Sequence, residues 1–303
     1  MKEKRLIVNA DDFGMSRGIT DGIILAHRYG FLTSTSLMAN MPTAEYAVSR
    51  LANVPRLGVG AHLNICTGRP ILHPREIPSL VDRDGHFHAP HIMIRKLWTW
   101  RTSAREIEAE FRAQIRWMCD RGVIPEHADS HHHMHLYPAA VLPFIRALDA
   151  EGILCARAPR SSVWPGAKVI GGPHEGSAVR RLSVHSYRTA LQFLAFRKLR
   201  MPESRISFLS KDRHNLAGLG ECWKVALASL PPGTFELACH PGLFERGFSE
   251  TDRIRMQREE ELYWLTNHEW LDVINSSGIQ LITYRELVEA PSRRPVTRAA
   301  AAL

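Results

Sequence analysis

Short apolar runs alternate with longer amphipathic stretches along most of this 303-residue chain. The runs at Arg5–Asn9, Ser34–Met38 and Leu57–His62 have the length and apolar content of buried strands. Between them, Arg17–Gly30 and Thr43–Leu51 carry apolar residues three and four positions apart, as one face of a helix does. Because strands that alternate with helices form mostly parallel sheets, the sequence predicts an α/β protein whose sheet is either open or closed into a barrel.

The alternation continues through the rest of the chain. A long helix is predicted at Ala104–Cys119 and a short extended segment at Pro125–Asp129. No repeat of fixed period and no low-complexity linker interrupts residues 1–290, so we expect a single domain, followed by a disordered tail over residues 291–303. The pattern further predicts helices at Tyr137–Ala150, Ser186–Leu199, Glu221–Ser229 and Arg253–Ser276 (one helix or two), a long loop over residues 160–181, and strands at Ile153–Ala158, Thr234–Cys239 and Ile279–Thr283.

Composition narrows the class of protein. With 45% hydrophobic and 23% charged residues the chain is typical of a globular protein, and no apolar run approaches the roughly 18 residues of a membrane helix. Asn9, Asp11 and Asp12 interrupt the first apolar run, which excludes a signal-peptide core, so we expect a cytoplasmic protein. The five cysteines form no Cys-x-x-Cys pair and are expected to be reduced thiols.

The net charge of +8 raises the question of an anionic partner. No known nucleic-acid-binding pattern occurs in the chain, so we expect no nucleic acid. Trp98 and Trp100 lie among the cations of the segment Arg95–Arg101, which leaves open a peripheral membrane contact, a stacked sugar ring or a partly packed helix. A homodimer is also left open.

Carboxylates and histidines follow several of the predicted strands. Asp11 and Asp12 come directly after the first strand, where two adjacent anions need a cation nearby unless one of them only caps the next helix. His62 ends one strand and His240 follows another. Five of the sixteen histidines fall within His127–His135, more than a core would bury without partners. Catalytic groups of α/β barrels gather at the carboxyl ends of the strands, so this coincidence favours a barrel over an open sheet.

These residue types are suited to metal-assisted hydrolysis. One carboxylate and two imidazoles with open positions can hold a divalent ion such as Zn²⁺, Fe²⁺, Mn²⁺ or Mg²⁺. A second carboxylate can then act as a general base on water, and a separate histidine can protonate a leaving group. Dinucleotide-binding, P-loop and serine-hydrolase motifs do not occur in the chain, which disfavours those three classes.

Five blocks of the sequence, taken together, resemble a known family. Between about Arg5 and Glu286 the chain resembles the YdjC-like carbohydrate deacetylases, which include chitooligosaccharide deacetylases. The resemblance implies a distorted (β/α) barrel and a hydrolase that removes the N-acetyl group from an acetylated amino sugar, its substrate partner. The blocks that carry it are Leu6–Gly14, Leu32–Met38, Gly58–Leu63, His127–His135 and Cys239–Pro241.

The resemblance also implies roles by position. The expected cofactor is one divalent metal ion, with Zn²⁺ or Mg²⁺ placed ahead of Co²⁺ or Mn²⁺. The implied metal ligands are Asp12, His62 and His131, with Asp11 as the base and His240 as the acid.

Four more residues are candidates for supporting roles. Asp129 is expected to hold a ligating imidazole from behind. His133 and His135 are expected to shape the sugar pocket. Arg157 is either a further pocket residue or a surface arginine. The segment over residues 160–215 and the region of Trp98 and Trp100 depart from shorter family members, so the sugar itself is left open.

Two alternatives remain at this point. A metal-dependent phosphoesterase could use the same aspartates and histidines, and the positive net charge would help to attract a phosphate. A catalytically idle sugar-binding barrel is the second alternative, although binding alone needs neither a base nor an acid.

Overall fold

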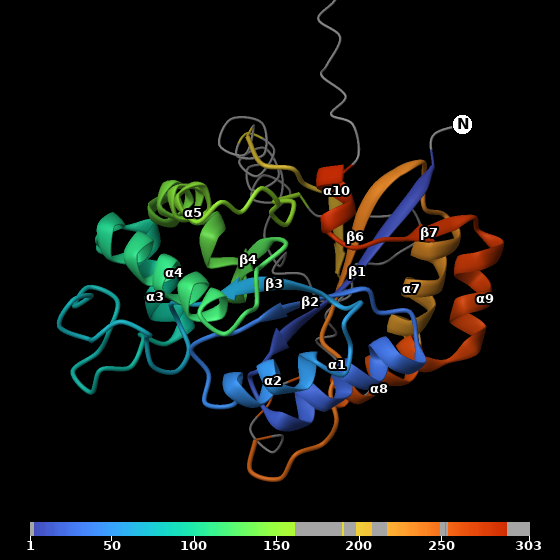
Figure 1. The fold of residues 1–303 in the computed structure, drawn as a ribbon, viewed down its shortest axis with the longest axis horizontal. Coiled ribbons are helices and arrows are strands. Elements are labelled where there is room, and N and C mark those ends of the chain that lie inside the picture. The colour runs from blue at the N-terminus through green and yellow to red at the C-terminus, as the bar shows by residue number, and fades with distance from the viewer. Residues whose placement is uncertain are drawn as a thin grey trace, which may run out of the picture.

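Seven parallel strands form one sheet in the order β4-β3-β2-β1-β6-β5, with β7 paired to the start of β1 (Figure 1). The computed structural model describes residues 3–160, 190, 198–207, 217–248, 252 and 254–289. The strands are β1 (Lys4–Phe13), β2 (Ser34–Leu37), β3 (Gly58–Leu63), β4 (Ala128–Ser130), β5 (Ser204–Ser207), β6 (Gly233–Cys239) and β7 (Ile279–Leu281).

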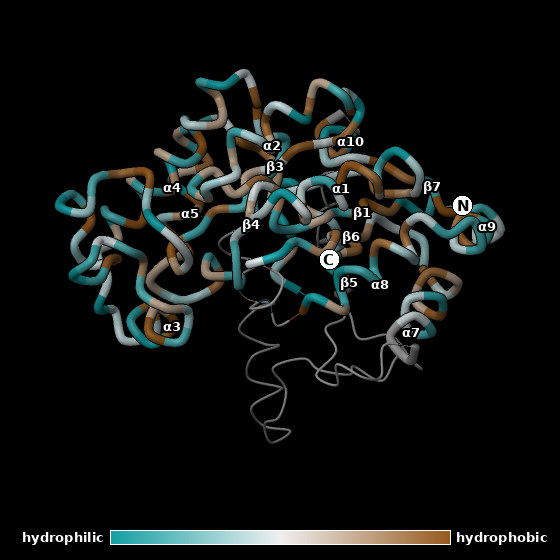
Figure 2. Tube along the Cα trace, turned by 90° about the horizontal axis from the view of Figure 1, so that it is seen from below, coloured by the Kyte–Doolittle hydropathy of each residue, from teal (hydrophilic) through white to brown (hydrophobic). Residues whose placement is uncertain are grey.

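Helices cover the outside of the sheet. In Figure 1, α3, α4 and α5 gather beside β3 and β4, whereas α7 and α9 lie beside β6 and β7. Apolar and hydrophilic stretches alternate along the helices in Figure 2, as expected where one face packs against a core. The helices are α1 (Arg17–Tyr29), α2 (Ala44–Leu51), α3 (Pro90–Trp98), α4 (Ala104–Cys119), α5 (Pro138–Ala150), α7 (Ala217–Ala228), α8 (Arg255–Thr266), α9 (His268–Ser276), α10 (Arg285–Glu289) and the 3₁₀ helix η1 (His131–Leu136).

A short extended segment joins the two ends of the sheet, β4 and β5. Ala156 forms a parallel bridge with Ala128 of β4, and Cys155 forms one with Arg200, shortly before β5. The amide of Arg205 on β5 then donates to the carbonyl of Arg160 at 2.9 Å. The sheet is therefore a distorted barrel, in which the segment from Cys155 to Arg160 occupies the closing position.

The inner face of the barrel is unusually polar around β1. Leu6, Val8 and Ala10 pack into the large apolar cluster beneath the helices. Because successive side chains of a strand face opposite sides, Asn9 and Asp11 point into the barrel instead. Both are almost completely buried, so their polar atoms need partners inside the barrel.

The sequence predicted this architecture well, with corrections at particular elements. The α/β class, the single domain and the distorted barrel are confirmed. The predicted strand Ile153–Ala158 is wrong as a regular strand, since it forms only isolated bridges. The first strand runs on to Phe13, past its predicted end at Asn9, and α3 and β5 were not predicted. Arg253–Ser276 is two helices. Most of the predicted helix Ser186–Leu199, most of the 160–181 loop and the tail lie outside the described residues.

None of the helices in the described part of the chain is both long and apolar enough to span a membrane.

Candidate functional site

Asp11 and Asp12 both reach the site because the backbone of β1 is irregular between them. The register of β1 against β2 shifts between Ala10 and Phe13, and Asp12 has a left-handed φ of 68°. A regular strand would send two consecutive side chains to opposite faces of the sheet. The left-handed residue re-aims the second carboxylate, and such strained residues occur preferentially at functional sites.

Three donor atoms converge at the carboxyl ends of β1, β3 and β4. Oδ1 of Asp12 lies 3.1 Å from Nδ1 of His131 and 3.5 Å from Nε2 of His62. All three donor atoms lie within 4.8 Å of one another. Donors about 2.1 Å from one tetrahedral ion are about 3.4 Å apart, so this spacing fits a divalent metal.

The histidine run is helical, not extended. Ser130 ends β4, and His131 begins η1 directly after it. Within η1, His132 and His133 have left-handed φ values of 52° and 54°. Only His131 of the run therefore joins the donor set, and the alternation of side chains expected for an extended segment does not occur.

Asp129 contacts the imidazole of His62 on the side away from the donor set. Its Oδ1 lies 2.8 Å from Nδ1 of His62, so that Nδ1 carries the proton and Nε2 faces the donor set. Burial alone would lower the pKa of His62, but the carboxylates of Asp129 and Asp11 raise it to about 10. With this pKa and no ion bound, Nε2 also carries a proton at neutral pH, and a divalent ion in the donor set would take the place of that proton.

Arg157 is completely buried, so it is not a surface arginine. Its guanidinium donates to both oxygens of Asp11, at 2.8 and 2.5 Å. The same group contacts Asp129 at 2.5 Å and donates to Glu236 from Nε at 2.9 Å. Burial would raise the pKa of Asp11, but the cations beside it, Arg157 first and His62 next, together lower it, so Asp11 is ionised near neutral pH. One arginine thus fixes the candidate base and the carboxylate behind His62 together.

A chain of hydrogen bonds through Asn9 and Ser36 also links the carboxylates of Asp11 and Asp129. The side-chain amide of Asn9 donates to Asp11 and to the hydroxyl of Ser36, each at 3.0 Å. Ser36 in turn donates to Oδ2 of Asp129 at 3.3 Å. Nε2 of His127 also contacts the Ser36 hydroxyl, at 3.2 Å, so Ser36 joins three neighbouring side chains.

Helix α8 supports the other side of the site. Arg258 donates to Oδ2 of Asp12 at 2.7 Å. Glu261, one turn later on α8, accepts a short hydrogen bond from the backbone amide of His240. Nε2 of His240 lies 3.9 Å from Oδ2 of Asp11, which places the candidate acid beside the candidate base.

The structure therefore brings together Asp11, Asp12, His62, His131 and His240, with Asp129 and Arg157 behind them. His133 lies apart from the donor set and contacts Arg205 at 2.8 Å. His135 is buried, contacts the Ser130 hydroxyl at 2.6 Å and stacks on Phe144, so it faces the core rather than a sugar pocket. Sequence reasoning missed Ser36, Glu236, Arg258 and Glu261, because a serine in a strand or a charge on a helix carries no distinctive signal.

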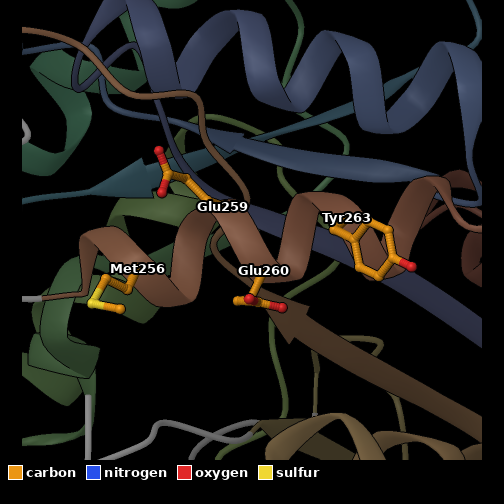
Figure 3. Close-up of a pocket in the computed structure, with 4 residues that line it drawn as sticks. All are labelled: Met256, Glu259, Glu260 and Tyr263. Carbon is orange, nitrogen blue, oxygen red and sulfur yellow. The ribbon is translucent and has the colours of Figure 1, made fainter. Parts of the chain in front are cut away.

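A shallow depression of about 370 Å³ lies elsewhere on α8 (Figure 3). It is lined by Met256, Glu259, Glu260 and Tyr263. Within the described part of the chain, both groups of residues spaced to hold a metal lie in the barrel instead, and they share His62. The metal candidate is therefore the barrel site.

Comparison with known proteins places the chain in a family. It is 31% identical to a carbohydrate deacetylase of Clostridium beijerinckii over 286 residues, which cover 93% of this chain and all of that protein. It is 32% identical to a carbohydrate deacetylase of Geobacillus stearothermophilus over 293 residues, covering 92% and 96% of the two chains. A putative cellobiose-phosphate cleavage protein of Enterococcus faecalis V583 has the same fold, with a TM-score of 0.74 and 25% identity over 94% of this chain and 99% of its own. The YdjC-like protein family matches residues 5–276, and the chain belongs to this family.

Proposed function

We propose that this chain is a metal-dependent carbohydrate deacetylase that removes the N-acetyl group from an acetylated amino sugar or oligosaccharide. The observation that carries the proposal is the convergence of Asp12, His62 and His131 on one point next to Asp11. Two relatives that align with more than nine-tenths of the chain bear the name carbohydrate deacetylase. The donor geometry suits a hydrolase that activates water beside an amide, and the names of the relatives support the same activity.

Asp12, His62 and His131 would hold one divalent ion, with Zn²⁺ or Mg²⁺ placed ahead of Co²⁺ or Mn²⁺. When bound, such an ion supplies a Lewis acid for the acetyl carbonyl and for the attacking water. Asp129 orients the imidazole of His62 through its 2.8 Å contact with Nδ1.

Asp11 takes the proton from the attacking water. Its carboxylate is held by Arg157 and Asn9, so it needs no reorientation before the reaction. Because Arg157 keeps the pKa of Asp11 low, the carboxylate is ionised and ready to accept a proton at neutral pH.

His240 delivers a proton to the departing sugar amine. Burial lowers its pKa, so the imidazole is neutral before the reaction and must gain its proton during it. Oδ2 of Asp11, 3.9 Å from Nε2 of His240, is a near source of that proton. One water then supplies both the new oxygen of acetate and the proton of the amine.

The test measures acetate release from N-acetylated chitooligosaccharides by protein stripped of metal and then reloaded. We expect acetate only after a divalent ion is restored, and an Asp11→Asn variant slower by about 10²- to 10⁴-fold, the usual contribution of a general base. Asp21→Asn, on α1, is the matched control and should keep the wild-type rate. Acetate release that needs no metal, or phosphate release from sugar phosphates with no acetate release, would overturn the proposal.

A further inference from the structure

Arg258 connects the site to three separate parts of the chain. Its Nη2 donates to Oδ2 of Asp12 at 2.7 Å, and its Nε donates to Asp252 at 2.6 Å. Its Nη1 donates to the backbone carbonyl of His240 at 3.4 Å. The residue is only 5% exposed, so it is not placed to bind a solvent-borne ligand.

Because Arg258 contacts Asp12, the two oxygens of the Asp12 carboxylate have different partners. Oδ2 is taken by the guanidinium, whereas Oδ1 faces His131 and His62. A carboxylate held in this way presents one oxygen to an ion instead of two. An open coordination position is what separates a catalytic metal site from a structural one.

Asp12 needs an anchor from outside its own strand. Its φ of 68° lies in the left-handed region, which a non-glycine residue keeps only where surrounding contacts hold it there. The strand geometry of β1 therefore does not fix where the carboxylate points. Arg258 fixes the direction of the Asp12 carboxylate, and Asp252 holds the Arg258 side chain in place.

We propose that Arg258 is a positioning residue that makes Asp12 a one-oxygen metal ligand. Through its second contact, Arg258 also links the Asp12 carboxylate to the backbone at His240. The inference rests on the metal site of the proposed function and adds a residue that determines its geometry. A guanidinium is needed, because three acceptors lie in three directions around it and a lysine ammonium is a point charge without that fork.

The charge of Arg258 and its positioning of Asp12 have opposite effects on metal affinity, which makes the proposal testable. A guanidinium near a divalent ion repels it, so loss of the charge alone would tighten metal binding. Loss of the positioning would weaken metal binding, typically by about 10- to 100-fold for a residue that orients a ligand. The sign of the change therefore separates the two effects.

The experiment is calorimetric titration of Zn²⁺ into stripped wild-type protein and three variants. We expect Arg258→Met to raise the Kd for Zn²⁺ by about 10- to 100-fold and Arg258→Lys by a smaller factor, about 3- to 10-fold. Arg255→Met removes the same charge one turn earlier on α8, where the arginine lies over Phe244, and should leave the Kd unchanged. In the Co²⁺-loaded protein, the visible absorption bands of Arg258→Met should change, because they report the number of ligand atoms.

The outcomes are distinct. Equal or tighter Zn²⁺ binding by Arg258→Met, or a loss of the same size in Arg255→Met, overturns the inference. If Arg258→Met does not fold, Arg258→Lys decides, since a wild-type Kd in that variant overturns the inference as well. Absence of binding of Zn²⁺, Mg²⁺, Co²⁺ and Mn²⁺ alike by the wild-type protein contradicts the proposed function itself, a separate result.

Discussion

Gly60 on β3 makes room for the buried imidazole of His127. A Cβ atom on Gly60 would lie 2.2 Å from Cε1 of His127, far inside contact distance. The imidazole stacks on Tyr284, with ring centroids 3.7 Å apart, so it has no free direction in which to move. We therefore expect Gly60→Ala to lower the free energy of unfolding by about 2–3 kcal/mol, the range of overpacked cores, as measured by urea unfolding.

The control for this prediction removes the clash. In a His127→Ala background, the added methyl group of Gly60→Ala meets empty space, and its cost should fall below about 1 kcal/mol. Equal costs in both backgrounds would show that strain in β3, and not contact with His127, causes the loss.

At the residue scale, the sequence indicated those candidate residues that are carboxylates or histidines at the ends of predicted strands. Asp11, Asp12, His62 and His240 each lie at or near the carboxyl end of an apolar run, and such ends meet at one face of a barrel. Arg258 gave no such signal, because a charged residue on a helix is ordinarily solvated. Its burial depends on how α8 packs, which is a property of the tertiary structure.

At the element scale, α4 holds the loop that follows the carboxyl end of β3, where His62 lies. Glu110 accepts hydrogen bonds from the backbone amides of Ile71 and Leu72, at 2.9 and 3.0 Å. Gln114, one turn later, exchanges hydrogen bonds with the backbone of Asn64. The apolar spacing predicted the buried face of α4, but not that two polar residues on it would bind a loop.

Burial gives Glu110 a measurable effect on stability. It raises the pKa of the carboxyl group to about 7, even though hydrogen bonds from Gln114, Ile71 and Leu72 lower it. Between about pH 4.5 and 7 the folded state thus binds more protons at this position than the unfolded state does, so stability falls as the pH rises. A shift of this size amounts to about 3 kcal/mol. We expect Glu110→Gln to flatten the decline in urea-unfolding free energy between pH 5 and pH 8.

Glu108→Gln, on the same helix, is the matched control because Glu108 faces the arginines Arg112 and Arg146. It should keep the wild-type decline. An unchanged decline in Glu110→Gln would mean that the carboxyl group titrates as if it were exposed. Glu76, the nearby carboxylate that also raises the pKa of Glu110, would remain in both variants.

At the scale of elements, the errors of prediction have physical causes. Ile153–Ala158 has the composition of a strand, yet it closes the barrel between two short strands and pairs only through isolated bridges. β5 has four residues, Ser204–Ser207, too few for a periodic pattern. Whether each of these two segments forms a regular strand depends on pairing partners far away in the sequence, which local composition does not reveal.

At the scale of the whole molecule, one arginine holds three parts of the barrel together. Arg157, on the closing segment, contacts Asp11 of β1, Asp129 of β4 and Glu236 of β6. Its removal leaves buried carboxylates without a counter-charge, a change that costs about 3–5 kcal/mol. We expect Arg157→Met to lower the urea-unfolding free energy by this amount at pH 7.

The pH dependence identifies the cause of that loss. Burial raises the pKa of Asp11 and Asp129, but Arg157 and His62 together hold both values below their ordinary range, so the stabilisation is present above about pH 4 and is lost below it. In Arg157→Met the buried carboxylates lack this counter-charge, so burial raises their pKa values and they take up protons as the pH falls from 7 to 4. The difference in unfolding free energy between wild type and Arg157→Met should therefore shrink over this range. Arg121→Met removes a surface pair with Glu45 and should leave the urea-unfolding free energy nearly unchanged, because solvent screens exposed pairs. A loss that is independent of pH would instead assign the effect of Arg157 to packing volume, because a cavity costs the same at every pH.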